Sequence, residues 1–154
     1  MTTFSVALDD AKARAMLDRV AKVGSGAKTM RAVSLVLRNL THEAFRDGAA
    51  NWPPLSPATL AARARKGNHS KQPLIATGAM YASIEASNTD TEASVSVGDG
   101  LPDARAWYNQ FGTLRAPARP FLPITNFGTP NPTQAWLDAV MEPVRKEMAE
   151  AVEA

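Results

Sequence analysis

Residues 106–124 read AWYNQFGTLRAPARPFLPI and carry four of the chain's ten aromatic residues with only two charges, both arginines. A segment of this composition is not a solvated linker. Gly112 suits a turn that needs positive φ, and the prolines after it hold the chain extended, because proline fixes φ and keeps its predecessor out of the helical region. The pattern predicts a short aromatic helix, a sharp reversal and an extended arm, residues 112–121.

Two interpretations of this stretch are open. Trp, Tyr and Arg are enriched at protein–protein hot spots, so aromatic anchors beside an arm with two arginines suit a partner contact. The alternative is a core strand with its loop, since large apolar residues are more often buried. Under the first interpretation the interface residues are Trp107, Tyr108, Phe111, Gly112, Arg115, Arg119 and Phe121.

Upstream of this stretch, residues 28–47 have the longest helical periodicity, with Gly48 as a stop, and predict the core helix. Before it, the alternation over Thr3–Leu8 predicts a strand, and a helix capped by Asp9 or Asp10 is expected to run to about Gly24. The apolar positions of the core helix are Met30, Val33, Leu37, Leu40 and Ala44, backed by Val36 and Phe45.

Between the core helix and the aromatic stretch, three short elements are expected. Ser56-Pro57 predicts a capped helix ending near Lys66, and Thr77 can cap a second short helix. Residues 84–97 alternate around Asn88-Thr89-Asp90, which indicates a hairpin. Asp103 can cap the aromatic helix.

Downstream, Asn131-Pro132 predicts the cap and first turn of a last helix. Pro143 falls inside that helix and should kink or divide it, because a proline removes a hydrogen bond and clashes with the preceding turn. The charge-rich part after Pro143 could pack on a neighbouring copy.

At 154 residues the chain has the length of one domain, residues 1–154, of class α+β. We expect a small antiparallel sheet packed by a long core helix and several shorter helices, with an extended arm and a C-terminal helix. Residues 1–27 and 125–154 are expected to be appendages. The absence of cysteine fits a reducing compartment, and no segment is apolar enough for a membrane helix, so we expect a soluble protein made in the cytoplasm.

Charge is unevenly distributed along the chain. Residues 1–73 carry 12 Lys/Arg against 5 Asp/Glu, whereas residues 74–154 carry 5 against 10. The opposite net charges of the two halves could drive head-to-tail contact between copies or set a basic face toward DNA. Equally, the positive and negative side chains could interleave once the chain has folded. The densest basic cluster lies in residues 63–71 and consists of Arg63, Arg65, Lys66 and Lys71. It could contact DNA phosphates or an acidic partner, or it could belong to a solvated loop without a partner.

The sequence lacks the usual signatures of catalysis. It has no phosphate-binding glycine motif and no nucleophile elbow, and neither His42 nor His69 stands in a zinc-binding pattern. We therefore expect no enzyme, cofactor or metal. A hydrolase that uses His42 or His69 is the least favoured hypothesis.

Five motifs in order resemble the phage virion morphogenesis, or tail-completion, family of Mu-like and other long-tailed phages. The resemblance covers about residues 28–124. Its motifs are WPPLSPAT at 52–59, LIATGAMYASI at 74–84, VSVG at 95–98, YNQFGT at 108–113 and PARPFL at 117–122.

This resemblance implies a non-enzymatic protein of the virion neck that completes the tail and joins it to the head. Relatives of this type are similar to tail terminators and head–tail connectors, which commonly form hexameric rings around the DNA channel. The implied partners are other copies, the tail tube protein and head-side connectors, with assembly in the host cytoplasm. The alternative function is a nucleic-acid-binding module that uses the basic cluster at 63–71.

Under the connector hypothesis, Phe121→Ala or deletion of 113–119 should leave a folded protein that yields no joined particles.

Overall fold

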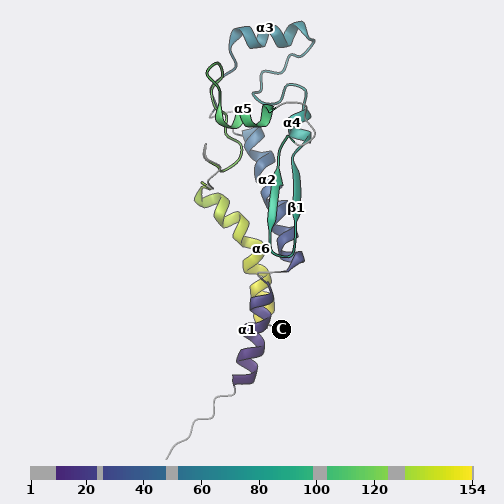
Figure 1. The fold of residues 1–154 in the computed structure, drawn as a ribbon, viewed down its shortest axis with the longest axis vertical. Helices are drawn as coiled ribbons and strands as arrows, with labels where there is room; N and C mark the ends of the chain where they lie inside the picture. Colours follow the sequence, from purple (N-terminus) through teal and green to yellow (C-terminus); the bar gives the residue numbers. More distant parts are fainter. Residues whose placement is uncertain (1–9, 24–25, 48–51, 99–103, 125–130, 154) are drawn as a thin grey trace, which may run out of the picture.

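The computed structural model describes residues 10–23, 26–47, 52–98, 104–124 and 131–153. The predicted strand at Thr3–Leu8 and the predicted cap Asp103 lie outside these ranges. The chain is elongated, and the long helix α2 lies in its middle part, between α3 at one end and α1 at the other (Figure 1). The elements in chain order are α1 (Asp10–Val23), α2 (Ala27–Asp47), α3 (Pro57–Arg65), α4 (Ala79–Ala82), β1 (Glu85–Asn88), β2 (Ala93–Ser96), α5 (Arg105–Phe111) and α6 (Gln134–Glu153).

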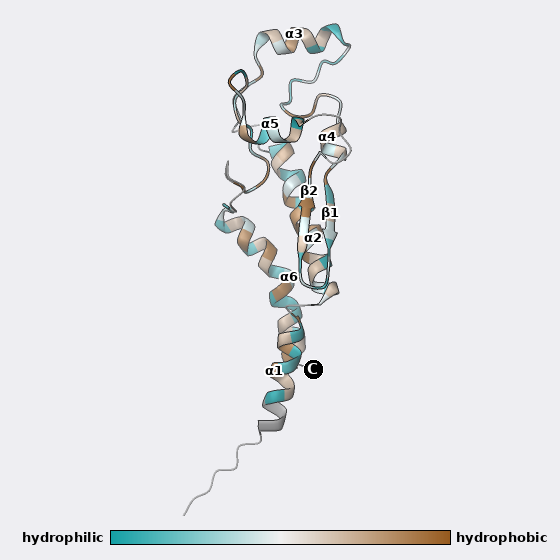
Figure 2. Ribbon diagram, in the orientation of Figure 1, coloured by the Kyte–Doolittle hydropathy of each residue, from teal (hydrophilic) through white to brown (hydrophobic). Residues whose placement is uncertain are grey.

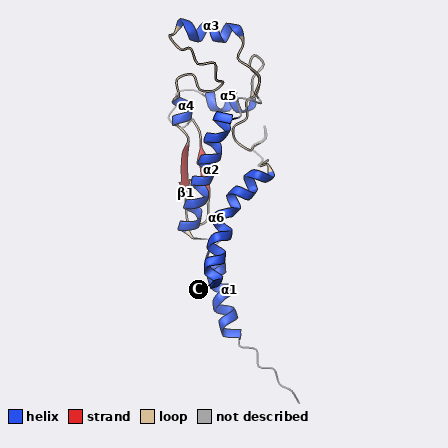
Figure 3. Cartoon of the chain, turned by 180° about the vertical axis from the view of Figure 1, so that it is seen from behind, coloured by secondary structure: helices blue, strands red, loops and turns tan. Residues whose placement is uncertain are grey.

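The predicted α+β class is confirmed. A two-stranded antiparallel sheet, β1 with β2, packs on α2, and α3, α4 and α5 lie toward one end of the molecule. At the other end, α1 lies beside the C-terminal part of α6 (Figures 1 and 3). The predicted long helix, the two short helices and the hairpin are all present. Ser56 caps α3 as predicted, but Gly78, and not Thr77, occupies the cap position of α4 and supplies no side-chain cap.

Helix α2 buries one face against the rest of the chain. Thr41 and Phe45 are completely buried, and Val33 nearly so. Two of the three buried hydroxyl residues of α2 bond within the helix: Thr41 Oγ1 donates to the carbonyl of Leu37 at 2.8 Å and Ser34 Oγ donates to that of Arg31 at 2.9 Å. The helix therefore buries polar residues without leaving these hydroxyls unpaired.

The hairpin depends on α2 for its stability. Ala86 pairs with Val95 across the strands, and the turn is held by Thr89, whose Oγ1 accepts hydrogen bonds from the backbone N–H groups of Thr91 and Glu92. An isolated two-stranded hairpin is marginal in water. Its contact with α2, where Ile84 is buried immediately before β1, provides the apolar face that such a hairpin needs.

The hydrophobic core collects residues from four separate segments at the C-terminal end of α2. Phe45 packs on Phe121 with ring centroids 4.7 Å apart and also approaches the ring of Tyr81. This core joins the aromatic stretch to α2, so the arm is part of the fold. The buried members are Phe45, Trp52, Met80, Ile84 and Phe121.

Helix α6 differs from the expectation at its start. Thr133, not Asn131, occupies the cap position: its hydroxyl accepts from the N–H of Trp136 at 3.4 Å, and its carbonyl accepts from that of Leu137. Pro132 therefore precedes the cap and lies outside the helix, which begins at Gln134. The prediction placed the cap two residues early.

The helix α6 is not divided by Pro143, although its axis turns along its length (Figure 1). It packs on α1 and α2 of its own chain, and Lys28 Nζ at the start of α2 lies 2.6 Å from Glu147 Oε1. Hydrophobic residues recur along α6 down to the part beside α1 (Figure 2). Several remain exposed: Leu137, Met141, Met148 and Val152.

We expect Phe121→Ala to lower the free energy of unfolding by about 3–5 kcal/mol, because it leaves a cavity beside Phe45. The matched control is Leu114→Ala, which is fully exposed and should stay within about 0.5 kcal/mol of wild type. Urea unfolding followed by circular dichroism measures both. Equal midpoints for the two variants would show that Phe121 is not a core residue.

A second prediction compares two glycines with positive φ. A Cβ on Gly112 would lie 2.7 Å from the amide nitrogen of Ala118, whereas one on Gly67 would meet nothing within 4 Å. In both alanine variants the positive φ costs about 1–3 kcal/mol. Gly112→Ala should be destabilised by about 1–3 kcal/mol more through the clash, as overpacking does. Thermal unfolding of the pair tests the difference, and equal destabilisation would contradict it.

Candidate interaction surface

Helix α5 presents opposite faces to the core and to solvent. Gln110 points inward and is only 4% exposed, whereas Trp107 and Tyr108 are 56% and 52% exposed. Phe111 is half-buried, and its ring packs edge to face on that of Trp107 with centroids 4.3 Å apart. The helix therefore displays Trp107 and Tyr108 on the surface, and Trp107 is supported by Phe111.

The buried amide of Gln110 binds the backbone of the returning chain. Its Oε1 accepts hydrogen bonds from the N–H groups of Phe121 and Leu122 at 2.9 and 3.0 Å. Its Nε2 donates to the carbonyl of Leu122 at 2.8 Å and, more weakly, to that of Ile124. The side chain of Gln110 thus supplies hydrogen-bond partners to the backbone of residues 121–124, as a neighbouring strand would in a sheet.

The arm turns back on itself within four residues. Gly112 takes φ +77°, and Thr113 and Ala116 exchange backbone hydrogen bonds, which leaves Leu114 and Arg115 exposed at the tip. The chain then runs back along α5, where the N–H of Arg119 donates to the carbonyl of Asn109 at 2.7 Å. The predicted reversal at Gly112 is confirmed, but the arm is a compact loop and does not reach away from the chain.

Two of the expected partner contacts are buried in their own chain. Phe121 is 2% exposed, and Arg119 is 7% exposed, with its guanidinium donating to the carbonyls of Pro53 and Pro54. The indole Nε1 of Trp52 donates to the carbonyl of Pro120 at 3.2 Å. We therefore correct the expectation for Arg119 and Phe121: they attach the arm to residues 52–54, and Phe121→Ala is a core mutation.

The surface that remains is smaller than the predicted set. It consists of exposed residues on α5 and on the tip of the arm, and we call it the arm surface. Leu114 belongs to it although the sequence did not single it out; its place after Gly112-Thr113 in a reversal was the available signal. Its members are Trp107, Tyr108, Leu114 and Arg115.

The basic cluster also divides on folding. Arg63 turns toward its own loop, where its Nη1 donates to the carbonyls of Ser70 and Gln72, both at 2.9 Å. Arg65, Lys66 and Lys71 are exposed around the end of α3. Arg63 thus closes the loop, and three of the four predicted residues remain for an acidic partner or phosphate.

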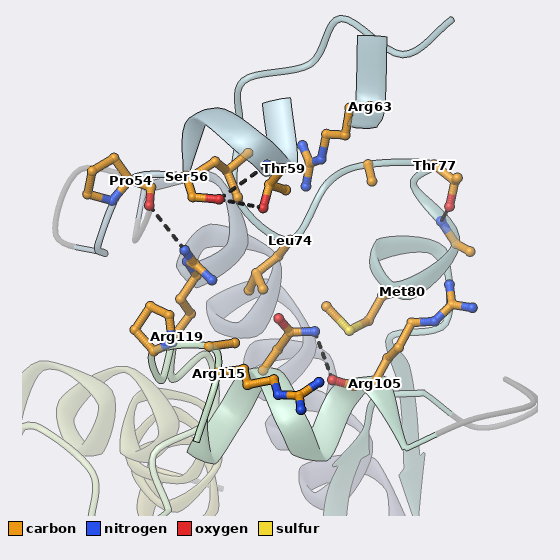
Figure 4. A pocket seen from close by; sticks show the side chains of 16 residues that line it. Pro54, Ser56, Thr59, Arg63, Leu74, Thr77, Met80, Arg105, Arg115 and Arg119 are labelled. Atoms are coloured by element: carbon orange, nitrogen blue, oxygen red, sulfur yellow. Dashed lines mark hydrogen bonds between the residues drawn. The ribbon is translucent and has the colours of Figure 1, made fainter. Parts of the chain in front are cut away.

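Arg63 and Arg119, which the sequence assigned to different sites, meet at one cavity between α3 and the arm (Figure 4). The pKa of Arg119 is lowered by burial and further by the charge of Arg63. Arg105 and Arg115 line the same cavity. Arg105 was missed because nothing near it in the sequence marks a basic site.

The histidines do not form a reactive pair with any group the structure describes. His42 packs edge to face on Tyr81, with ring centroids 4.4 Å apart, and its buried Nδ1 has no hydrogen-bond partner. Burial lowers its pKa, and Arg38 and Arg46 lower it further, so the neutral form is favoured. His69 is exposed on the loop after α3.

Two general features bear on the kind of protein. Among the described residues, no three His, Cys, Asp or Glu side chains lie together as a metal site would require. None of the described helices is long and apolar enough to cross a membrane.

Comparison with protein families matches residues 8–144 to the phage virion morphogenesis family. No curated protein and no solved structure matches significantly. The matched region is wider than the five motifs, because it includes α1 and the first half of α6. Since the match spans most of the sequence, the chain belongs to the phage virion morphogenesis family.

Proposed function

We propose that this chain is a structural protein of the phage neck, which completes the tail and joins it to the head as one subunit of a ring around the DNA channel. Membership of a virion morphogenesis family supports a role in building the particle. The neck position, the ring and its six copies are our proposal. The proposed partners are other copies, the tail tube protein and head-side connector proteins.

The observation that carries this proposal is the arm surface. Trp107, Tyr108 and Leu114 are large apolar side chains that lie in solvent, on a helix and a loop that the buried Gln110 ties to the backbone of residues 121–124. Exposed apolar groups on a rigid support are typical of protein-binding sites, since little conformational entropy is lost on binding. Aromatic residues of this kind supply most of the binding energy in many interfaces.

The extent of exposed surface supports assembly with other copies. Among the described residues, nine large hydrophobic side chains are exposed, against six hydrophobic side chains that are buried in the core. The apolar residues left exposed along α6 are among the nine. A subunit that gains its remaining burial from neighbours would show this excess.

The connector proposal predicts that Trp107→Ser combined with Tyr108→Ser leaves folding intact and abolishes joined particles, because the partner loses its aromatic anchors. Complementation of a phage lacking the gene, with joined particles counted by electron microscopy, measures the effect. We expect the yield to fall by about 100-fold or more, from two anchors worth about 2 kcal/mol each. The control is Leu35→Ser, an exposed apolar residue of α2 away from the arm surface. Wild-type yields from the double variant would refute the proposal.

A second candidate function is DNA binding through Arg65, Lys66 and Lys71. The observation in its favour is that all three are exposed, and no described carboxylate pairs with them. Such a site would contact phosphates without reading sequence.

This second candidate predicts salt-dependent retention on double-stranded DNA. Every phosphate that a basic side chain neutralises adds about 0.9 to the steepness of log K against log salt, so the triple alanine variant should reduce the steepness by about 2–3. Electrophoretic shifts at several salt concentrations measure the slope, with His69→Ala on the same loop as control. A wild-type protein without any salt slope would exclude DNA binding by this cluster.

A further inference from the structure

The cavity between α3 and the arm is lined by four arginines. Its volume is about 350 Å³, and no aspartate or glutamate is among the described residues around it. The guanidinium groups enter from different segments: Arg63 from α3, Arg105 from the start of α5, and Arg115 and Arg119 from the arm (Figure 4). We call this site the arginine cleft.

Two of these arginines bring positive charge that their hydrogen-bond partners do not neutralise. Arg63 and Arg119 donate to backbone carbonyls, which satisfy hydrogen bonds but carry no compensating charge. The two lie close enough for the charge of Arg63 to disfavour the protonated form of Arg119. An anion in the cleft would relieve this repulsion and bind more strongly than at an open surface, because the site is partly desolvated.

The shape and lining of the cleft favour carboxylates of a protein over phosphates of DNA. Leu74 and Met80 lie between the arginines (Figure 4), so an occupant must offer apolar contact together with negative charge. A cavity of this volume takes a few side chains. Arginine also binds carboxylates in a fixed, two-pronged geometry, which gives selectivity to a peptide contact.

The chain itself carries an acidic segment of the required kind. Residues 72–104 contain no lysine or arginine, and the hairpin within them has three exposed acidic residues, Glu85, Asp90 and Glu92. None of these three forms an ion pair with a described residue. The turn lies at the end of the hairpin that points away from α3 (Figures 1 and 3), so it does not reach the cleft of its own chain.

We propose that the arginine cleft of one copy receives the acidic hairpin turn, residues 89–92, of the next copy. The contact joins unlike surfaces, so it can repeat from copy to copy and close into a ring or continue as a filament. This inference rests on the proposed assembly of copies and identifies the two surfaces that meet. It also gives the carboxylates of the hairpin turn a partner of opposite charge.

Disulfide trapping tests the contact directly, because the chain has no cysteine of its own. Thr91→Cys marks the turn and Ala116→Cys marks the rim of the cleft; both positions are exposed. Mixed and oxidised at high protein concentration, the two variants should form a covalent dimer, since docking brings the two Cα atoms within the roughly 7 Å that a disulfide requires. The control partner for Thr91→Cys is Ala61→Cys, exposed on α3 and absent from the cleft lining. It should give no dimer above background.

Charge exchange then tests the chemistry. Arg115→Glu in the Ala116→Cys chain, or Glu92→Arg in the Thr91→Cys chain, should lower the yield of dimer about tenfold, as expected when a close charge pair is removed. Both side chains are exposed, so folding should be unchanged by circular dichroism. Mixing the two reversed chains should restore the yield.

Three results would overturn the inference. The first is that no dimer is trapped at any protein concentration, and the second is that neither charge reversal changes the yield of dimer. The third is salt-dependent binding of duplex DNA that Arg115→Glu abolishes, which would place phosphate in the cleft. Particle complementation separates this inference from the proposed function. Normal joined particles without trapping would refute the cleft contact alone, whereas trapping without any role in joining would refute the neck function alone.

Discussion

The amide of Gln110 is the interaction on which the arrangement of this chain depends. It is buried at the junction of α5 and the returning arm and makes hydrogen bonds to the backbone of Phe121, Leu122 and Ile124. Those bonds satisfy the buried amide of Gln110 and the N–H groups of Phe121 and Leu122, and an unsatisfied buried group costs about 1–3 kcal/mol. They also set the position of Phe121 against Phe45, and hence the attachment of α5 to α2.

The same attachment of the arm positions the two candidate interaction surfaces. Arg119 and the indole of Trp52 fasten the arm to residues 52–54, so the arm tip projects from a fixed base. The exposed aromatics of α5 and the arginine cleft share this base. A small core and exposed apolar side chains fit our proposal that the chain gains further burial from neighbouring copies.

Much of the local structure could be predicted from the sequence. The caps and breakers located α2 and α3 to within a residue or two, and Gly112 was correctly assigned to a reversal, because these signals act over neighbouring residues. The opposite net charge of the two chain halves predicted less about which charged residues lie together. Folding brings Arg63 together with three of the five basic residues of the acidic half, Arg105, Arg115 and Arg119, and leaves the acidic hairpin apart from them.

Periodicity, capping residues and short motifs were enough to establish the α+β class, the main helices, the hairpin and the likeness to a virion morphogenesis family. They could not establish which members of the aromatic and arginine sets are exposed, and that answer came from the packing of the whole chain. Composition makes Arg115 and Arg119 equivalent, yet one lies at the arm tip while the other is buried against the carbonyls of Pro53 and Pro54. Burial of this kind depends on contacts between residues more than 60 positions apart, and such contacts leave no periodic trace in the sequence.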